Sequence, residues 1–194
     1  MLKQNSELRA EARNALDGQW LMAAAATLIY FIIAGAVSQT FVGIILVVFH
    51  LDYGLTVMLW NRLKEGKPVS IDALFDGFRE YGRLLGTFAL MFVYILLWTL
   101  LLVIPGIIKS YSYSMTYFIL KDNPGLEGDA AIEKSMAMMH GHKTKLFLLD
   151  LSFIGWAILC LFTCGIGFLF LTPYMYTAHA AFYEDLKAQA NEQR

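Results

Sequence analysis

Charged residues are scarce in this sequence of 194 residues, and a strong excess of either sign is absent. Lys, Arg, Asp and Glu make up 16% of the chain, whereas a typical soluble domain contains about 25%. The formal net charge of −1 argues against nucleic acid as a partner, because binding it requires a basic surface. The polar segments are too short to build a soluble core of their own. We therefore expect a single domain over residues 1–194.

Cysteine is also rare, which excludes a disulfide framework and a cysteine-rich metal centre. Cys160 and Cys164 are four residues apart, a spacing that predicts one shared helix face, where a disulfide would be strained. We interpret both as apolar packing residues. His140 and His142 lack further ligands at a suitable spacing. P-loop, dinucleotide-binding and nucleophile-elbow motifs are missing, so no metal, cofactor or catalytic residue is predicted.

Long apolar runs are what the sequence has in abundance. Hydrophobic residues make up 58% of the chain, and a membrane-spanning helix needs about 20 mostly apolar residues. The predicted spans are residues 20–37, 41–60, 84–104, 105–120, 146–163 and 165–183. The fourth and sixth of these are shorter or more polar than the others. This pattern predicts an all-α membrane protein with six transmembrane helices arranged as three hairpins.

A short amphipathic segment precedes each predicted hairpin. In residues 3–17, Leu8, Ala12 and Leu16 share one helical face. Similar segments follow Ser70, a candidate N-terminal cap, and cover residues 129–139. We expect all three to be helices that lie on the cytoplasmic surface of the membrane.

Similar motifs close the three amphipathic segments, around Gly18, Gly77 and Gly141. Their near-regular spacing of about 60 residues indicates an internal triplication, with units at residues 1–64, 69–122 and 129–185. The alternative is that any protein built from helical hairpins shows such likenesses.

The basic residues predict the topology. All but one of the 15 Lys and Arg residues lie in the N-terminus, the two long links or the C-terminal tail, the exception being Lys109. The positive-inside rule then places both termini and both links in the cytoplasm. We therefore predict a multi-pass protein of the cytoplasmic membrane.

Polar side chains within the predicted spans are the candidate functional residues, because a polar group is costly in lipid. Most lie on the returning helix of each hairpin, so we expect them to face a polar interior while residues 20–37 and 84–104 face lipid. The candidates are His50, Asp52, Tyr113, Asp150, Tyr176 and His179. Asp150 is expected to reach interfacial water or a lysine of the preceding turn. For each of these residues, structural pairing is the alternative to transport or catalysis.

The basic turn before residue 146 is the candidate contact for lipid headgroups. His142, Lys143 and Lys145 lie within four residues of one another, and lysines beside a span attract anionic headgroups.

The last third of the chain resembles a bacterial family of integral membrane proteins called domain of unknown function 975. The likeness rests on residues 139–143, on the LSFIGW stretch at residues 151–156, on residues 165–167 and on Pro173-Tyr174. The stretch at residues 16–20 resembles the opening of that family, so the likeness extends over nearly the whole chain. It implies a multi-pass bacterial membrane protein. It implies no activity, and therefore no catalytic residue.

Three hypotheses about function follow. The first is a non-enzymatic scaffold or lipid-associated accessory factor, whose partners are membrane lipids and either another membrane protein or a second copy of the chain. The second is a small transporter or channel-like protein with a polar interior. The third, an intramembrane enzyme, is the weakest because no acid–base pair is evident in the sequence.

Overall fold

The computed structural model describes residues 2–126 and 128–192, and within these residues every regular element is helical. Two elements depart from α-helical geometry: η1 is a π-helical turn and η2 is a 3-10 helix. The elements are α1 (Asn5–Leu16), α2 (Trp20–Val37), α3 (Phe41–Gly43), η1 (Ile44–Val48), α4 (Phe49–Glu65), η2 (Asp72–Phe78), α5 (Tyr81–Leu101), α6 (Val103–Tyr113), α7 (Thr116–Asp122), α8 (Asp129–Met138), α9 (Lys143–Leu151), α10 (Ile154–Phe162) and α11 (Phe168–Glu192).

Four helical stretches in the described part are long and apolar enough to cross a membrane, which indicates a membrane protein. They are Trp20–Val37, Ile44–Glu65, Tyr81–Leu101 and Lys143–Phe162. They correspond to four of the six predicted spans. The sixth prediction corresponds to α11, which has 25 residues but is too polar to qualify by composition.

The prediction of a continuous helix over residues 105–120 is wrong, because the chain breaks between α6 and α7. The Ser114 hydroxyl donates to the carbonyl oxygen of Tyr111 at 2.8 Å, and the Thr116 hydroxyl donates to that of Tyr113 at 2.7 Å. The backbone N–H of Met115 donates to the Ser135 side chain. Hydroxyl side chains of this kind compete with the regular helical hydrogen bonds.

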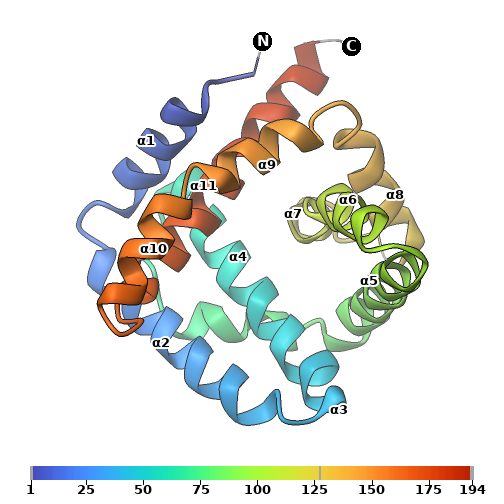
Figure 1. The fold of residues 1–194 in the computed structure, drawn as a ribbon, viewed down its shortest axis with the longest axis horizontal. Helices are drawn as coiled ribbons and strands as arrows, with labels where there is room; N and C mark the ends of the chain where they lie inside the picture. The colour runs from blue at the N-terminus through green and yellow to red at the C-terminus, as the bar shows by residue number, and fades with distance from the viewer. Residues whose placement is uncertain (1, 127, 193–194) are drawn as a thin grey trace.

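Helix α4 runs through the middle of the molecule, and the other spans lie around it (Figure 1). Of its most apolar stretch 56% is buried, against 22%, 17% and 22% in the stretches of α2, α5 and α9–α10. Large apolar side chains of α2 and α5 are exposed, among them Ile32 and Leu97. These two helices are therefore largely exposed, as a lipid-facing position would require.

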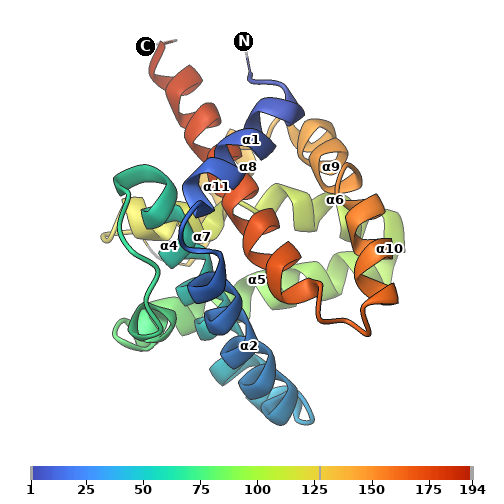
Figure 2. The same ribbon diagram turned by 90° about the vertical axis from the view of Figure 1, so that its left-hand side faces the viewer.

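The hairpin of α5 and α6 runs across the direction of α2 and α4. Figure 2 shows α2 descending while α5 and α6 cross the view, and in Figure 1 the same pair is seen nearly end-on. The spans therefore do not form a parallel bundle of three similar hairpins.

The apolar faces of the first and third amphipathic segments contact protein, contrary to the expectation that they lie on the bilayer, whereas Ile71 and Phe75 of the second remain exposed. Leu8, Ala12 and Leu16 of α1 are fully buried, and α1 packs on α11 and α4. In the second segment, η2 packs on α4 and Ser70 caps no α-helix. Ala131 and Ile132 of α8 are buried as well. The driving force is the same burial of apolar surface, with protein as the apolar neighbour.

The three glycines behind the proposed triplication have different conformations. Gly18 and Gly141 have positive φ angles of 70° and 79°, which suit a residue without a side chain. Gly77 lies instead against α4, where an added Cβ would come within 2.3 Å of the carbonyl oxygen of His50. The second unit therefore uses its glycine for close packing rather than for a turn.

The two cysteines do not share a helix face, contrary to expectation. Cys160 is buried in α10, whereas Cys164 lies beyond the end of that helix, is exposed and has a positive φ of 51°. The helix ends at Phe162, before its next turn would have aligned the two residues.

Candidate functional site

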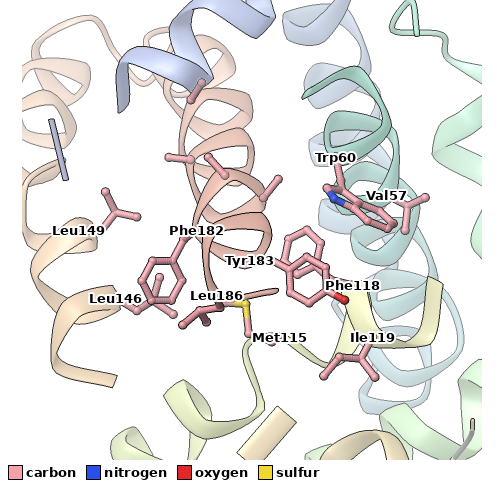
Figure 3. Close-up of a cluster of buried hydrophobic side chains, with 14 of the residues drawn as sticks. Val57, Trp60, Met115, Phe118, Ile119, Leu146, Leu149, Phe182, Tyr183 and Leu186 are labelled. Carbon is pink, nitrogen blue, oxygen red and sulfur yellow. The ribbon is translucent and has the colours of Figure 1, made fainter. Parts of the chain in front are cut away.

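Helix α11 lies against three other helices that each present a carboxylate to it. The side chains of Tyr176, His179 and Tyr183 recur at helical spacing and contact Asp52 of α4, Asp150 of α9 and Asp122 of α7. Figure 3 shows the apolar packing beside this row, with Phe182 and Tyr183 of α11 between Leu149 of α9 and Trp60 of α4. Apolar packing holds α11 in register with its polar partners.

Asp52 is bound by neutral hydroxyl groups. The Tyr176 hydroxyl donates to Oδ1 of Asp52, and the Tyr117 hydroxyl is also hydrogen-bonded to this carboxylate. Tyr30 of α2 is hydrogen-bonded to Tyr176 in turn. None of the ion pairs found among residues 2–126 and 128–192 includes Asp52.

Asp150 does not pair with a lysine of the preceding turn, which corrects the expectation from the sequence. Nε2 of His179 lies 2.5 Å from Oδ1 of Asp150, and the Tyr111 hydroxyl donates to Oδ2 at 2.9 Å. A helix places side chains three and four residues apart on one face, so Asp150 and Lys145, five apart, diverge. No acid–base pair was evident from the sequence, but Asp150 and His179 form one in the structure.

Asp122 forms the third contact of the row, at the end of α7. It accepts hydrogen bonds from the Tyr183 hydroxyl at 2.8 Å and from Lys187, and Nζ of Lys64 lies 3.4 Å away. Burial by itself raises the pKa of Asp122. The hydrogen bonds and the positive charge of Lys187 outweigh it, and the pKa lies below the usual range.

A cavity of about 250 Å³ with several polar side chains in its wall lies between α4, α5, α6, α7 and α11. Its wall combines one carboxylate and one imidazole with several hydroxyl groups and two apolar side chains. The lining residues are Asp52, His179, Thr56, Ser110, Tyr113, Ser114, Tyr117, Tyr176, Met91 and Phe118.

Four of the six predicted interior residues line this cavity: Asp52, Tyr113, Tyr176 and His179. Asp150 adjoins it through His179. His50 lies elsewhere, fully buried and stacked on Tyr81 with ring centroids 4.3 Å apart. Asp52, two residues further along the helix, points elsewhere because residues i and i+2 of a helix do not face each other.

Sequence reasoning missed Tyr30 and the role of Tyr111. Tyr30 belongs to a span that was expected to face lipid as a whole. The available signal was its hydroxyl, a polar group within an apolar run that needs a partner in lipid. Tyr111 carried no such signal, because several tyrosines and serines surround it in the sequence.

Two grooves elsewhere combine a single cation with mostly apolar walls. The first, of about 330 Å³, is formed by α1, α2, α10 and α11 and is lined by Arg13, Trp20, Trp156, Cys160, Gly167, Phe170, Leu171 and Tyr174. The second, of about 180 Å³, is lined by Lys143, Thr144, Ile107, Ile108, Tyr111 and Phe147.

The predicted headgroup residues lie at the start of α9. Lys143 lines the second groove. His142 occupies the cap position of the helix without a capping hydrogen bond, and Lys145 lies in the first turn, partly buried.

Of the comparisons with known proteins, the one with protein families finds a match. No curated protein and no solved structure matches the chain. A family profile described as "Protein of unknown function (DUF975)" matches residues 69–190. The match covers more than half of the chain, although it leaves out the stretch at residues 16–20. It includes the LSFIGW stretch and both Asp150 and His179. This chain therefore belongs to the DUF975 family.

Proposed function

We propose that this protein is a non-enzymatic, lipid-associated accessory protein of the bacterial cytoplasmic membrane. The observation that carries the proposal is the groove at Arg13. A cation at the end of an apolar groove matches the two parts of an anionic phospholipid, the headgroup and the acyl chain. Trp20, Trp156 and Tyr174 add the amphipathic rings that favour the membrane interface.

The state of Arg13 supports this assignment. Arg13 is exposed, and its guanidinium group has no ion-pair or hydrogen-bond partner among those found for residues 2–126 and 128–192. The exposed Arg79, by contrast, pairs with Asp76 at 3.3 Å. The Lys143 groove repeats the pattern of one cation beside apolar side chains.

The hydrogen bonds around Asp150 and His179 favour a non-enzymatic role. The nearby cavity contains Ser110 and Ser114, but their hydroxyls donate to the carbonyl oxygens of Ile107 and Tyr111 at 2.8 Å. A serine nucleophile requires a hydroxyl hydrogen-bonded to its base. The Asp150–His179 pair is therefore best understood as a structural contact between α9 and α11.

The test of the lipid assignment is the lipid that remains bound through purification. The protein is extracted in a non-ionic detergent, and the anionic phospholipid per protein is measured by mass spectrometry. Arg13→Gln should lower that ratio by about fivefold, the effect of losing one cation near an anionic headgroup. Arg79→Gln, which lies outside both grooves, is the matched control. Equal retention in Arg13→Gln and wild type would contradict the proposal.

The proposal includes the predicted topology, with both termini in the cytoplasm. Native Cys164 is exposed on the turn between α10 and α11, a turn that we assign to the outer side. A membrane-impermeant thiol reagent should label it from outside. Cysteines at Ser38, Lys67 and Ala190, introduced singly after Cys164→Ser, should react from outside at Ser38 only. Labelling of Lys67 from outside would refute the topology. Glu127, in the second link, lies outside the described residues.

A small transporter is the second candidate function, and the polar cavity at Asp52 favours it. Transport requires solute flux by the purified protein. Flux in proteoliposomes that Asp52→Asn abolishes would support a transporter over an accessory protein.

A further inference from the structure

We propose that the cavity at Asp52 binds a protonated primary amine, a small organic cation that carries N–H donors. This inference does not depend on the Arg13 groove, and it holds for an accessory protein and a transporter alike. The argument uses the charge of the cavity wall, the hydrogen-bonding capacity of its hydroxyls, and its size.

The charge of the wall favours a cation. Asp52 receives hydrogen bonds from Tyr117 and Tyr176, which are neutral. The one basic side chain among the lining residues, His179, is bound to a second carboxylate at Asp150, 2.5 Å away. Asp52 is therefore the one carboxylate among the lining residues, and none of the ion pairs found among residues 2–126 and 128–192 includes it. A bound cation would compensate its negative charge.

The hydroxyl groups favour a ligand that donates hydrogen bonds. Ser110 and Ser114 donate their protons to backbone carbonyls, and Tyr117 is hydrogen-bonded to the carboxylate of Asp52. A hydroxyl that has donated its proton still has acceptor lone pairs. The wall thus offers acceptors to a ligand, and an ammonium group, with three donors and no acceptor, is the matching partner.

The size and composition of the cavity favour an organic cation over a metal ion. Its volume of about 250 Å³ exceeds the roughly 30 Å³ that one water occupies in the liquid. No group of three metal-ligating side chains is found in the described part of the chain. Aromatic rings and Met91 complete the wall, and such rings attract organic cations.

The test is binding of n-butylammonium chloride to the full-length protein in a non-ionic detergent, measured by isothermal titration calorimetry. Sodium chloride of equal ionic strength and tetramethylammonium, which has no N–H donor, are the comparison salts. We expect butylammonium to bind more tightly than either. Equal responses to butylammonium and sodium would overturn the proposal, and tighter binding of tetramethylammonium would overturn the requirement for donors.

Three variants assign the binding to this cavity. Asp52→Asn should weaken butylammonium binding by about tenfold or more, because it removes a charge-assisted hydrogen bond. Asp122→Asn is the matched control, since Asp122 also accepts a hydrogen bond from a tyrosine of α11 but lies outside the cavity. The Asp122→Asn protein should bind butylammonium as tightly as wild type. Met91→Trp should reduce binding by filling the cavity while Asp52 remains intact. Unchanged binding in a folded Asp52→Asn or Met91→Trp protein would refute the site.

The ammonium group could belong to a free amine or to the headgroup of phosphatidylethanolamine. The titration is therefore repeated in nanodiscs of phosphatidylethanolamine and of phosphatidylcholine, each with the same share of anionic lipid. Weaker butylammonium binding in phosphatidylethanolamine identifies the headgroup as the ligand, and equal binding identifies a free amine. Because Arg13→Gln leaves Asp52 in place, that variant should bind butylammonium normally, so failure of the lipid proposal can be distinguished from failure of this one.

Discussion

Helices α4 and α5 both have the length and composition of a membrane span, but they occupy opposite environments. In α4 nearly every residue from His50 to Trp60 is buried. In α5 the buried residues are Leu84, Thr87 and Phe88, and the second half of the helix is largely exposed. Apolar composition therefore makes both helices candidate membrane spans without showing which one lies at the centre.

The polar residues explain the difference. Helix α4 carries Asp52, which needs a partner that lipid cannot supply, and the hydroxyls of Tyr117 and Tyr176 provide one. Residues 84–101 of α5 contain no Asp, Glu, His, Lys or Arg, so the helix can face lipid without leaving a charge unpaired.

The largest expected effect comes from truncating matched leucines on the two helices. Leu55 of α4 is 0% exposed and Leu97 of α5 is 58% exposed. Leu55→Ala should lower the free energy of unfolding by about 2–5 kcal/mol, because it leaves a cavity in the core. Leu97→Ala should change it by less than about 0.5 kcal/mol. Chemical denaturation in detergent measures both, and equal losses would contradict the central position of α4.

A glycine pair tests how closely each helix is approached. A Cβ on Gly54 of α4 would lie 1.9 Å from the carbonyl oxygen of Leu74, whereas a Cβ on Gly86 of α5 would meet nothing within 4 Å. Gly54→Ala should destabilise the protein by about 3 kcal/mol, the upper end of the range for overpacking. Gly86→Ala should be neutral or stabilising by up to about 1 kcal/mol, since alanine is the better helix former. Thermal unfolding measures the stability of both variants. A Gly54→Ala protein as stable as wild type would show that η2 does not pack on α4.

Replacing Asp52 tests whether its hydrogen bonds hold α4 in place. Asp52→Leu strands the hydroxyls of Tyr117 and Tyr176 and should cost about 2 kcal/mol. Asp52→Asn keeps an acceptor and should cost less. Thermal stability in detergent is the measurement. If Asp52→Leu were as stable as wild type, the carboxylate would be solvated by water in the cavity rather than paired.

The smallest expected effect concerns the ion cluster that joins the end of α4 to α7 and α11. The pKa of Asp122 lies below its usual value in the folded protein, so its contribution to stability is present above the unfolded pKa of about 3.9. It is lost as the pH falls through the lower folded pKa. Asp122→Asn should therefore lower the melting temperature more at pH 7 than at pH 3. Lys64 and Lys187 are partly exposed, so we expect the cluster to contribute less than about 1 kcal/mol to the free energy of unfolding. An equal loss at both pH values would show that the charge contributes nothing.

The sequence alone determined the helical class and the family. Of the six spans that it predicted, four are candidate spans in the structure, because hydropathy over about 20 residues is a local property. It also determined that polar side chains of the returning helices would turn inward, since lipid offers them no partner. Four of the six predicted interior residues line one cavity for this reason.

Only the tertiary structure decided how these side chains pair and which helix is central. Asp150 meets His179 and Tyr111, residues 29 and 39 positions away, and a local pattern contains no information on contacts of that length. The break between α6 and α7 depends on Ser135 of another helix. The stripe of α1 illustrates the general reason. Its amphipathic pattern is the same whether the apolar neighbour is lipid or α11. The sequence therefore shows that the apolar stripe is covered, and the fold determines that protein covers it.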